Sequence, residues 1–122
     1  MDTSVIVDHL RGDVAAIELL RSIALANEQM IASEVVRFEL LAGVRDREVE
    51  ALELFFDAVN WIPVDEEISR TAGDLARRHR KAYSGIDDAD YLIAATAISL
   101  RADLLTVNVK HFPMLRGLVA AY

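Results

Sequence analysis

The sequence contains no cysteine, which excludes a disulfide framework and any metal site built from thiolates. It also has no charge-free apolar run of about eighteen residues, so we expect no membrane-spanning helix and no membrane partner. The first residues, Met1 to Ser4, lack the basic and then apolar pattern of a secretory signal peptide. These absences together predict a soluble protein of the cytoplasm.

Basic residues are also scarce, because 13 Lys and Arg stand against 20 Asp and Glu and give a net charge of −7. Modules that only bind nucleic acid are usually basic, since contacts with phosphates supply much of their affinity. The charge therefore disfavours a passive nucleic-acid-binding module. It does not exclude a nuclease, because a divalent cation held by clustered carboxylates reverses the local field.

What the sequence does contain is apolar surface for one core, with 53% hydrophobic residues in 122. That length predicts a single domain over residues 1–122. Helical patterns alternate with short apolar runs, which favours an α/β fold with a parallel sheet between helices. We expect helices at 5–10, 13–26, 34–41, 46–57, 65–81 and 87–101, and strands at 29–32, 61–64, 103–107 and 118–122.

The beginning of the chain is unusual for such a fold. A doubly wound sheet normally opens with a complete apolar strand, whereas this sequence reaches Asp2 at once. Two explanations stay open: the first strand is very short, or residues that belong to it lie outside the sequence.

Three acidic residues are poorly explained by folding alone. Asp2 precedes Thr3 and Ser4, and a helix cap is the alternative explanation for it. Glu39 falls on or beside the apolar stripe of its helix, unless it reaches solvent or pairs with an arginine. Asp90 comes directly before a nearly all-apolar helix of small residues. Acids are stabilised at the positive, amino-terminal end of a helix, which explains Asp87 and Asp88 better than it explains Asp90.

These acids are expected to converge. Active sites of open parallel sheets form beyond the carboxyl ends of the strands, where Asp2 and Asn108 would end strands and Asp90 would start a helix. Glu39 lies on the helix after the second strand. Converging carboxylates repel one another, and a hard cation with oxygen ligands relieves this, so Mg²⁺ is implied, with Mn²⁺ as a substitute. Such a site suits phosphodiester hydrolysis, because the cation activates water and stabilises charge on phosphoryl oxygens.

In order and spacing, the sequence resembles PIN-domain ribonucleases, and within them the VapC toxins. The matching segments are Asp2-Thr3-Ser4, Glu39-Leu40-Leu41-Ala42-Gly43, Asp90-Tyr91-Leu92-Ile93-Ala94-Ala95-Thr96-Ala97 and Leu105-Thr106-Val107-Asn108-Val109-Lys110-His111-Phe112.

The resemblance implies a PIN-like α/β/α sandwich with a short central parallel sheet flanked by helices. It also implies Mg²⁺-dependent endoribonuclease activity, a role as toxin in a type II toxin–antitoxin system, a homodimer, and a VapB-like antitoxin as inhibitor. By position, Asp2, Glu39 and Asp90 look like the metal-binding acids. Asn108 stands where many relatives have a fourth acid, which leaves open one metal or two, and Asp87 is a candidate for the missing charge.

Other interpretations remain open. A receiver-like signalling domain would need a second acid beside Asp2, and a haloacid-dehalogenase phosphatase would need one at Ser4. A PIN-like module that has lost catalysis and only binds partners is favoured by Asn108 alone. The basic run 77–81 is either a contact for RNA phosphates or a solvated helix end. The early helices and the segment 46–57 contain more apolar residues than one buried face needs. These residues either line a groove that binds an antitoxin helix, or they fill the core and the homodimer interface.

Overall fold

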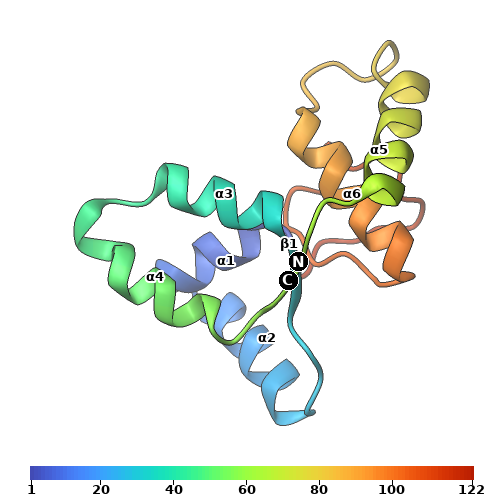
Figure 1. Cartoon of the computed structure of the whole chain (residues 1–122). Coiled ribbons are helices and arrows are strands. Elements are labelled where there is room, and N and C mark those ends of the chain that lie inside the picture. Colours follow the sequence, from blue (N-terminus) through green and yellow to red (C-terminus); the bar gives the residue numbers. More distant parts are fainter.

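The computed structural model describes all residues from 1 to 122 and is rich in helix. The elements are α1 (Thr3–Leu10), α2 (Val14–Leu25), β1 (Ile31–Ser33), α3 (Glu34–Gly43), α4 (Val49–Phe56), β2 (Asn60–Ile62), α5 (Glu66–His79) and α6 (Asp88–Leu100), with 3₁₀ turns at Asp46–Glu48 and Val109–His111. Helices α1 to α4 lie on one side of β1, and α5 and α6 lie on the other (Figure 1). No helix combines the length and the apolar character needed to cross a bilayer.

The sheet is short and parallel, as the sequence predicted. β1 pairs with β2 with Ile31 opposite Asn60 and Ser33 opposite Ile62. Each strand has three residues and differs in position from the prediction, because β1 extends to Ser33 and β2 ends at Ile62, before Pro63. A proline has no N–H to continue a ladder, which accounts for the early end of β2.

Three helices begin where the sequence placed them. Asp13, Ser33 and Asp65 precede α2, α3 and α5, and the side-chain oxygen of each accepts a hydrogen bond from a backbone N–H of the first turn. Such a bond satisfies a donor that the helix itself leaves without a partner. The start of each helix is therefore marked by a hydrogen bond between residues close together in the sequence.

The expected strands at 103–107 and 118–122 were wrong, since neither segment is a strand. The two segments share a single backbone bond, from the N–H of Ala121 to the carbonyl of Thr106 (2.9 Å). The first segment is joined to the amino end of the chain by another, from the N–H of Asp2 to the carbonyl of Leu105 (2.9 Å). These two isolated bonds do not make a continuous ladder.

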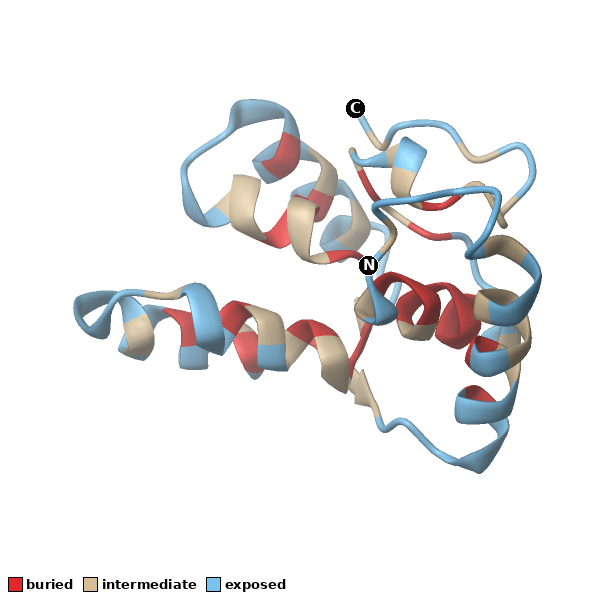
Figure 2. Cartoon of the chain, turned by 90° about the horizontal axis from the view of Figure 1, so that it is seen from above, coloured by how far each residue is buried: buried red, intermediate tan, exposed pale blue.

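Helix α6 is the central element of the core. Seven of its residues are buried, among them Ile93, Ala94 and Ala95 (Figure 2). Its small side chains allow β1, α3 and α5 to pack closely around it, and α5 makes the most extensive contact. The expectation of a tightly packed helix behind Asp90 is thereby confirmed.

Phe112 provides a test of this core. Its side chain is 1% exposed and belongs to the larger apolar cluster, whereas Phe38 is 70% exposed. We expect Phe112→Ala to lower the free energy of unfolding by about 3–5 kcal/mol, because it leaves a cavity. Phe38→Ala should change it by no more than about 0.5 kcal/mol. Urea unfolding followed by circular dichroism measures both, and equal effects would show that the core is wrongly assigned.

Candidate active site

Asp2 is held in place by the segment that follows α6. One oxygen of its carboxylate, Oδ2, accepts hydrogen bonds from the hydroxyls of Thr106 (2.7 Å) and Ser4 (2.9 Å). Its N–H donates to the carbonyl of Leu105 (2.9 Å). The residue is only 5% exposed, and its second oxygen, Oδ1, has no hydrogen-bond partner. Asp2 precedes α1 without capping it through its side chain, so the cap explanation for this residue was wrong.

Asp90 lies in the first turn of α6 and is 8% exposed. Its Oδ2 accepts a hydrogen bond from the N–H of Asp87 (3.2 Å) and lies 3.4 Å from Nδ1 of His111. The hydrogen bond from the N–H of Asp87 caps the start of α6, so Oδ2 of Asp90 has a structural role that the sequence analysis had assigned only to Asp87 and Asp88. The other oxygen, Oδ1, accepts no hydrogen bond.

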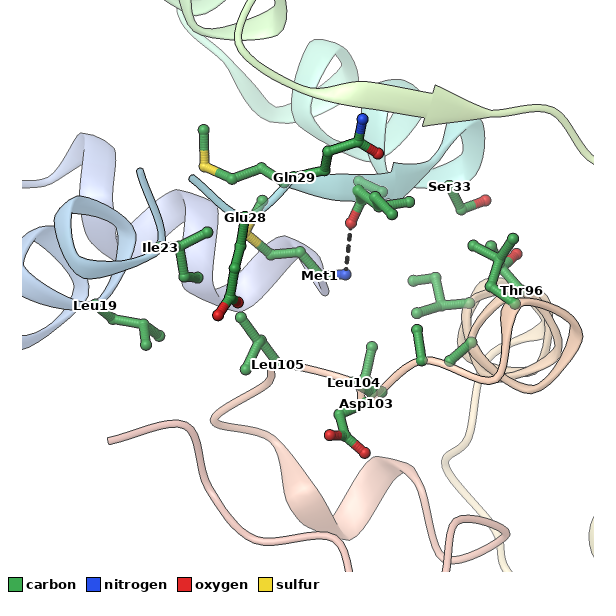
Figure 3. A pocket seen from close by; sticks show the side chains of 17 residues that line it. Met1, Leu19, Ile23, Glu28, Gln29, Ser33, Thr96, Asp103, Leu104 and Leu105 are labelled. Atoms are coloured by element: carbon green, nitrogen blue, oxygen red, sulfur yellow. Dashed lines mark hydrogen bonds between the residues drawn. The ribbon is translucent and has the colours of Figure 1, made fainter. Parts of the chain in front are cut away.

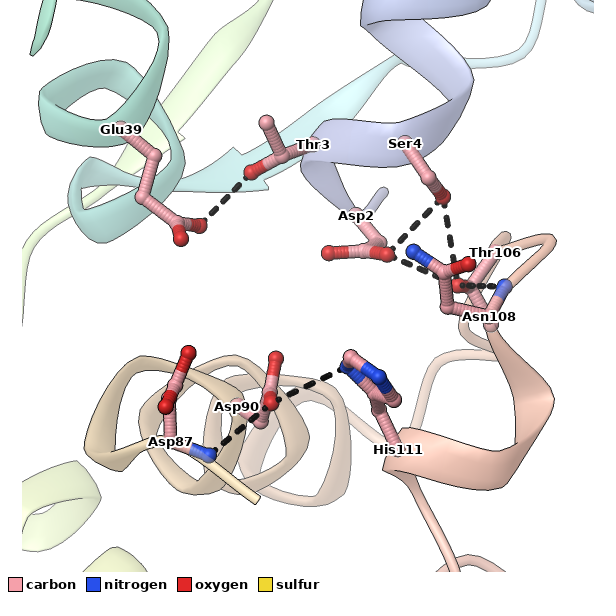
Figure 4. Close-up of polar contacts among 9 residues, drawn as sticks. All are labelled: Asp2, Thr3, Ser4, Glu39, Asp87, Asp90, Thr106, Asn108 and His111. Atoms are coloured by element: carbon pink, nitrogen blue, oxygen red, sulfur yellow. Dashed lines mark hydrogen bonds and ion pairs between the residues drawn. The ribbon is translucent and has the colours of Figure 1, made fainter. Parts of the chain in front are cut away.

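The carboxylates of Asp2 and Asp90 face the same space (Figure 4). Burial raises the pKa of Asp90, the N–H of Asp87 and the imidazole of His111 lower it, and the negative charge of Asp2 raises it further. A buried acid whose ionisation is disfavoured by a neighbouring carboxylate calls for a proton or a cation beside it. The predicted convergence of Asp2 and Asp90 is present in the geometry.

Glu39 approaches the same space from α3 (Figure 4). Its Oε1 accepts a hydrogen bond of 2.7 Å from the hydroxyl of Thr3, the first residue of α1. It makes no ion pair with an arginine, because the nearby Arg37 pairs with Glu34. Glu39 therefore joins α3 to α1 beside Asp2.

Asn108 and Asp87 complete the group. The N–H of Asn108 donates to the hydroxyl of Thr106 (2.9 Å), and its side-chain amide makes no hydrogen bond. Figure 4 shows Asn108 beside Asp2, and Asp87 beside Asp90. Both residues are exposed, so they border the site on its open side.

The oxygen atoms of the site fit a hard divalent cation, but only two of its acids lie close together. Carboxylate and amide oxygens are the ligands that such ions prefer, and Asp2 and Asp90 each present a free oxygen. No three His, Asp or Glu side chains lie close enough together to hold one ion. Asp87 lies beside Asp90, and Glu39, which is bonded to Thr3, would have to move toward the pair before it could contribute.

Two residues of the site were missed by the sequence analysis. Thr106 is fully buried and links Asp2 to Asn108 through its hydroxyl. His111 has no metal-ligand spacing in the sequence, yet the 3₁₀ turn Val109–His111 places it against Asp90. The available signal was position: both residues lie within three of Asn108.

The basic run at the end of α5 stands apart from the acids. Arg77 and Arg78 form ion pairs with Asp74 of the same helix, which is the pattern of a solvated helix face. Arg80 differs, because it pairs with Asp88 in the first turn of α6. Trp61 packs edge-on against Phe56, away from the acids, and is a packing residue.

Comparison with known proteins agrees with this geometry. The PIN domain profile matches residues 1–113. The chain is 58% identical to ribonuclease VapC19 of Mycobacterium tuberculosis, over 100% of this chain and 98% of the relative. It is 40% identical to ribonuclease VapC10 of the same organism, over 97% of this chain and 88% of that one.

Solved structures share the fold. VapBC-1 from nontypeable Haemophilus influenzae superposes with a TM-score of 0.75 at 27% identity, covering 91% of this chain and 87% of that one. VapBC2 from Rickettsia felis, solved bound to a DNA fragment from its promoter, superposes with a TM-score of 0.82 at 24% identity, covering 98% of this chain and 93% of that one.

The chain is a member of the PIN-domain family. Within that family it belongs with the VapC ribonucleases.

Asp90 gives a prediction about stability without metal. Because its pKa is raised on folding, the folded chain binds a proton more readily than the unfolded chain, and stability falls as the pH rises above the ordinary Asp value of 3.8. Asp90→Asn removes this loss, so its melting temperature at pH 7 in EDTA should exceed that of the parent by several degrees.

The matched control is Asp88→Asn, which changes an exposed acid of the same helical turn. We expect at most a small decrease in its melting temperature, because the Arg80–Asp88 ion pair that it breaks is exposed to solvent. Melting curves from pH 4 to 8 should show a flatter profile for Asp90→Asn than for the parent. A melting temperature of Asp90→Asn below that of the parent at pH 7 would show that Asp90 is held by a stabilising ion pair with His111.

Proposed function

We propose that this protein is an endoribonuclease that depends on Mg²⁺, accepts Mn²⁺, and acts as the toxin of a type II toxin–antitoxin system. One observation carries the proposal: two buried carboxylates, Asp2 and Asp90, face each other, and each has a free oxygen. The ribonuclease names of VapC19 and VapC10 support the reaction class. The proposed unit of activity is a single PIN domain over residues 1–122.

The proposed ligands of the cation are Asp2, Asp90 and Glu39, the last after it turns away from Thr3. Asn108 contributes a neutral oxygen on the open side, where it orients a ligand or the substrate. When bound, the cation supplies activation of water and stabilisation of the charge that develops on the phosphoryl oxygens. One neutral residue among the four leaves less negative charge, which favours one bound ion over two.

The rest of the site positions these groups. Ser4 and Thr106 orient Asp2 through its Oδ2, which leaves Oδ1 directed at the shared space. The N–H of Asp87 and the imidazole of His111 do the same for Asp90. Because four donors hold two carboxylates, little rearrangement of these two residues is needed when the cation and the RNA phosphate arrive.

The activity test uses the two facing acids. Asp2→Asn and Asp90→Asn should each lower the rate of Mg²⁺-dependent RNA cleavage by more than about 100-fold, while circular dichroism stays unchanged. Asp88→Asn should retain the parent rate, since it leaves the site intact. A folded Asp90→Asn protein of full activity would remove this residue from the mechanism. No cleavage by the parent with either metal would favour a module that only binds partners.

A VapB-like antitoxin is the proposed partner, and the proposed assembly of the toxin is a homodimer. The structural relatives are VapBC toxin–antitoxin complexes, which supports such a partner. A groove of about 490 Å³ lies between α1, α3 and the start of α4, and its walls include Val7, Leu10 and Val44. Glu39 lines the same groove, so a helix laid in it reaches the acids, where a basic side chain would replace the cation.

This docking site is tested by Leu10→Asp. Leu10 is an exposed wall of the groove, and a carboxylate there should weaken antitoxin binding by at least about tenfold without altering RNA cleavage. Leu54→Asp is the control, because Leu54 is exposed but does not line the groove. Calorimetry with the antitoxin measures affinity, and light scattering measures the dimer. Loss of the dimer alone in Leu10→Asp would assign the groove to the homodimer.

A further inference from the structure

The acidic site repels phosphate through its own charge, although the proposed substrate, RNA, is a polyanion. Its acids are Asp2, Glu39, Asp87 and Asp90, and the basic side chain beside them is that of His111 (Figure 4). One divalent cation neutralises only part of this charge. Affinity for nucleic acid depends largely on Lys and Arg side chains that contact phosphates. RNA binding at this site therefore needs a permanent positive charge at its border.

The apolar cavity beside Met1 does not supply this charge. It has a volume of about 430 Å³ and lies between α2, α6 and the segment 102–105 (Figure 3). No lysine or arginine lines it, and its charged side chains are those of Glu28 and Asp103. The amino group of Met1 donates to the carbonyl of Ile31 (2.9 Å). Phosphate would be repelled in this cavity, so the contact has to come from the border of the acidic site.

Two arginines near the acids, in the sequence or in the fold, are already paired. Arg37 precedes Glu39 by two residues, and its Nε lies 2.7 Å from a carboxylate oxygen of Glu34. Arg80 reaches the first turn of α6, where it pairs with Asp88. A phosphate would have to compete with a carboxylate for either guanidinium group.

Lys110 is the basic residue at the border of the site that has no such partner. It lies in the 3₁₀ turn Val109–His111, two residues after Asn108, and takes part in no ion pair. It is exposed, whereas Nδ1 of the neighbouring His111 lies 3.4 Å from the carboxylate of Asp90. Successive side chains of a 3₁₀ helix point about 120° apart, because each turn has three residues. Lys110 is therefore directed away from the acidic pair and toward solvent.

The turn that carries Lys110 is anchored at both ends. Before the turn, the N–H of Asn108 donates to the hydroxyl of Thr106 (2.9 Å), and this hydroxyl donates to Asp2 (2.7 Å). After the turn, Phe112 is 1% exposed and belongs to the apolar core. The ammonium group of Lys110 thus sits on a flexible side chain whose base is fixed relative to Asp2.

We propose that Lys110 binds a phosphate of the RNA substrate, next to the phosphodiester bond that lies in the acidic site. This inference rests on the proposed ribonuclease function and adds to it a residue that binds the substrate through charge. A lysine ammonium acts on phosphate as a compact cation, and contacts with phosphates carry no sequence information. Lys110 therefore contributes to the affinity for RNA and not to the choice of the cleavage sequence.

The experiment measures RNA binding separately from cleavage. Fluorescence anisotropy gives the affinity of the parent, Lys110→Gln and Lys110→Arg for labelled oligouridylate and oligoadenylate, in EDTA and over a range of KCl concentrations. Cleavage of a single-stranded RNA transcript in Mg²⁺ gives kcat and KM for the same proteins. Lys81→Gln is the matched control, because Lys81 is the other lysine of the chain, is exposed and forms no ion pair.

We expect Lys110→Gln to bind both RNAs about fivefold more weakly or worse, with the slope of log affinity against log KCl reduced by about 0.7. Its KM should rise while kcat is unchanged, because the lost contact is equally strong before and during the reaction. Lys110→Arg keeps the charge and should bind as the parent does. The melting temperature of Lys110→Gln and its rise with Mn²⁺ should match those of the parent, because Lys110 is exposed and is not a ligand of the cation.

An equal loss of affinity in Lys81→Gln would show that only the net charge matters and would overturn the proposal. A loss confined to one of the two RNAs would indicate a contact with a base and would overturn it as well. Unchanged binding and KM in Lys110→Gln, with full cleavage by the parent, would contradict the phosphate contact alone. No cleavage by the parent would contradict the proposed function alone, because the binding measurement in EDTA does not depend on cleavage.

Discussion

Asp2 and Asp90 are two negative charges that the fold brings together where water is largely excluded. Each precedes or opens a helix, and α1 and α6 are fixed by the core behind them, so the acids cannot move apart without loss of packing. Burying a charge is unfavourable unless it is paired. The chain meets part of this demand with hydrogen bonds to one oxygen of each acid. The remaining oxygens carry charge that a cation would balance, and for this reason we regard the pair as the centre of the site.

The surrounding elements can be understood from this constraint. The small residues of α6 let it lie deep in the core, and this places Asp90 at the inner end of an open space rather than on the surface. Thr106 fixes Asp2 from the far side, although the segment that carries it is not a regular strand. Behind Asp2, the N–H of Leu105 makes no hydrogen bond.

Much of this could be predicted from local sequence, and the rest depends on tertiary contacts. Capping residues such as Asp13 and Ser33 set helix starts by bonds within a few residues, which is why those starts were predicted. The strand at 103–107 was wrong because a strand needs a partner, and its apolar pattern says nothing about whether one is present. The approach of Asp2 and Asp90 followed from a rule of topology, whereas Glu39 is bonded to Thr3 and does not form one group of three with them. Thr106 and His111 were missed because a hydroxyl or an imidazole has no spacing rule that marks it as a support for an acid.

The central claim is that the facing carboxylates form one cation site. The most direct measurement is the melting temperature of the nuclease as a function of Mn²⁺ concentration, for the parent and for Asp2→Asn. A cation that binds only the folded chain raises the melting temperature as its concentration increases. The account predicts a saturable rise for the parent and none for Asp2→Asn over the same range. An equal rise in both proteins would place the cation elsewhere and would contradict the claim.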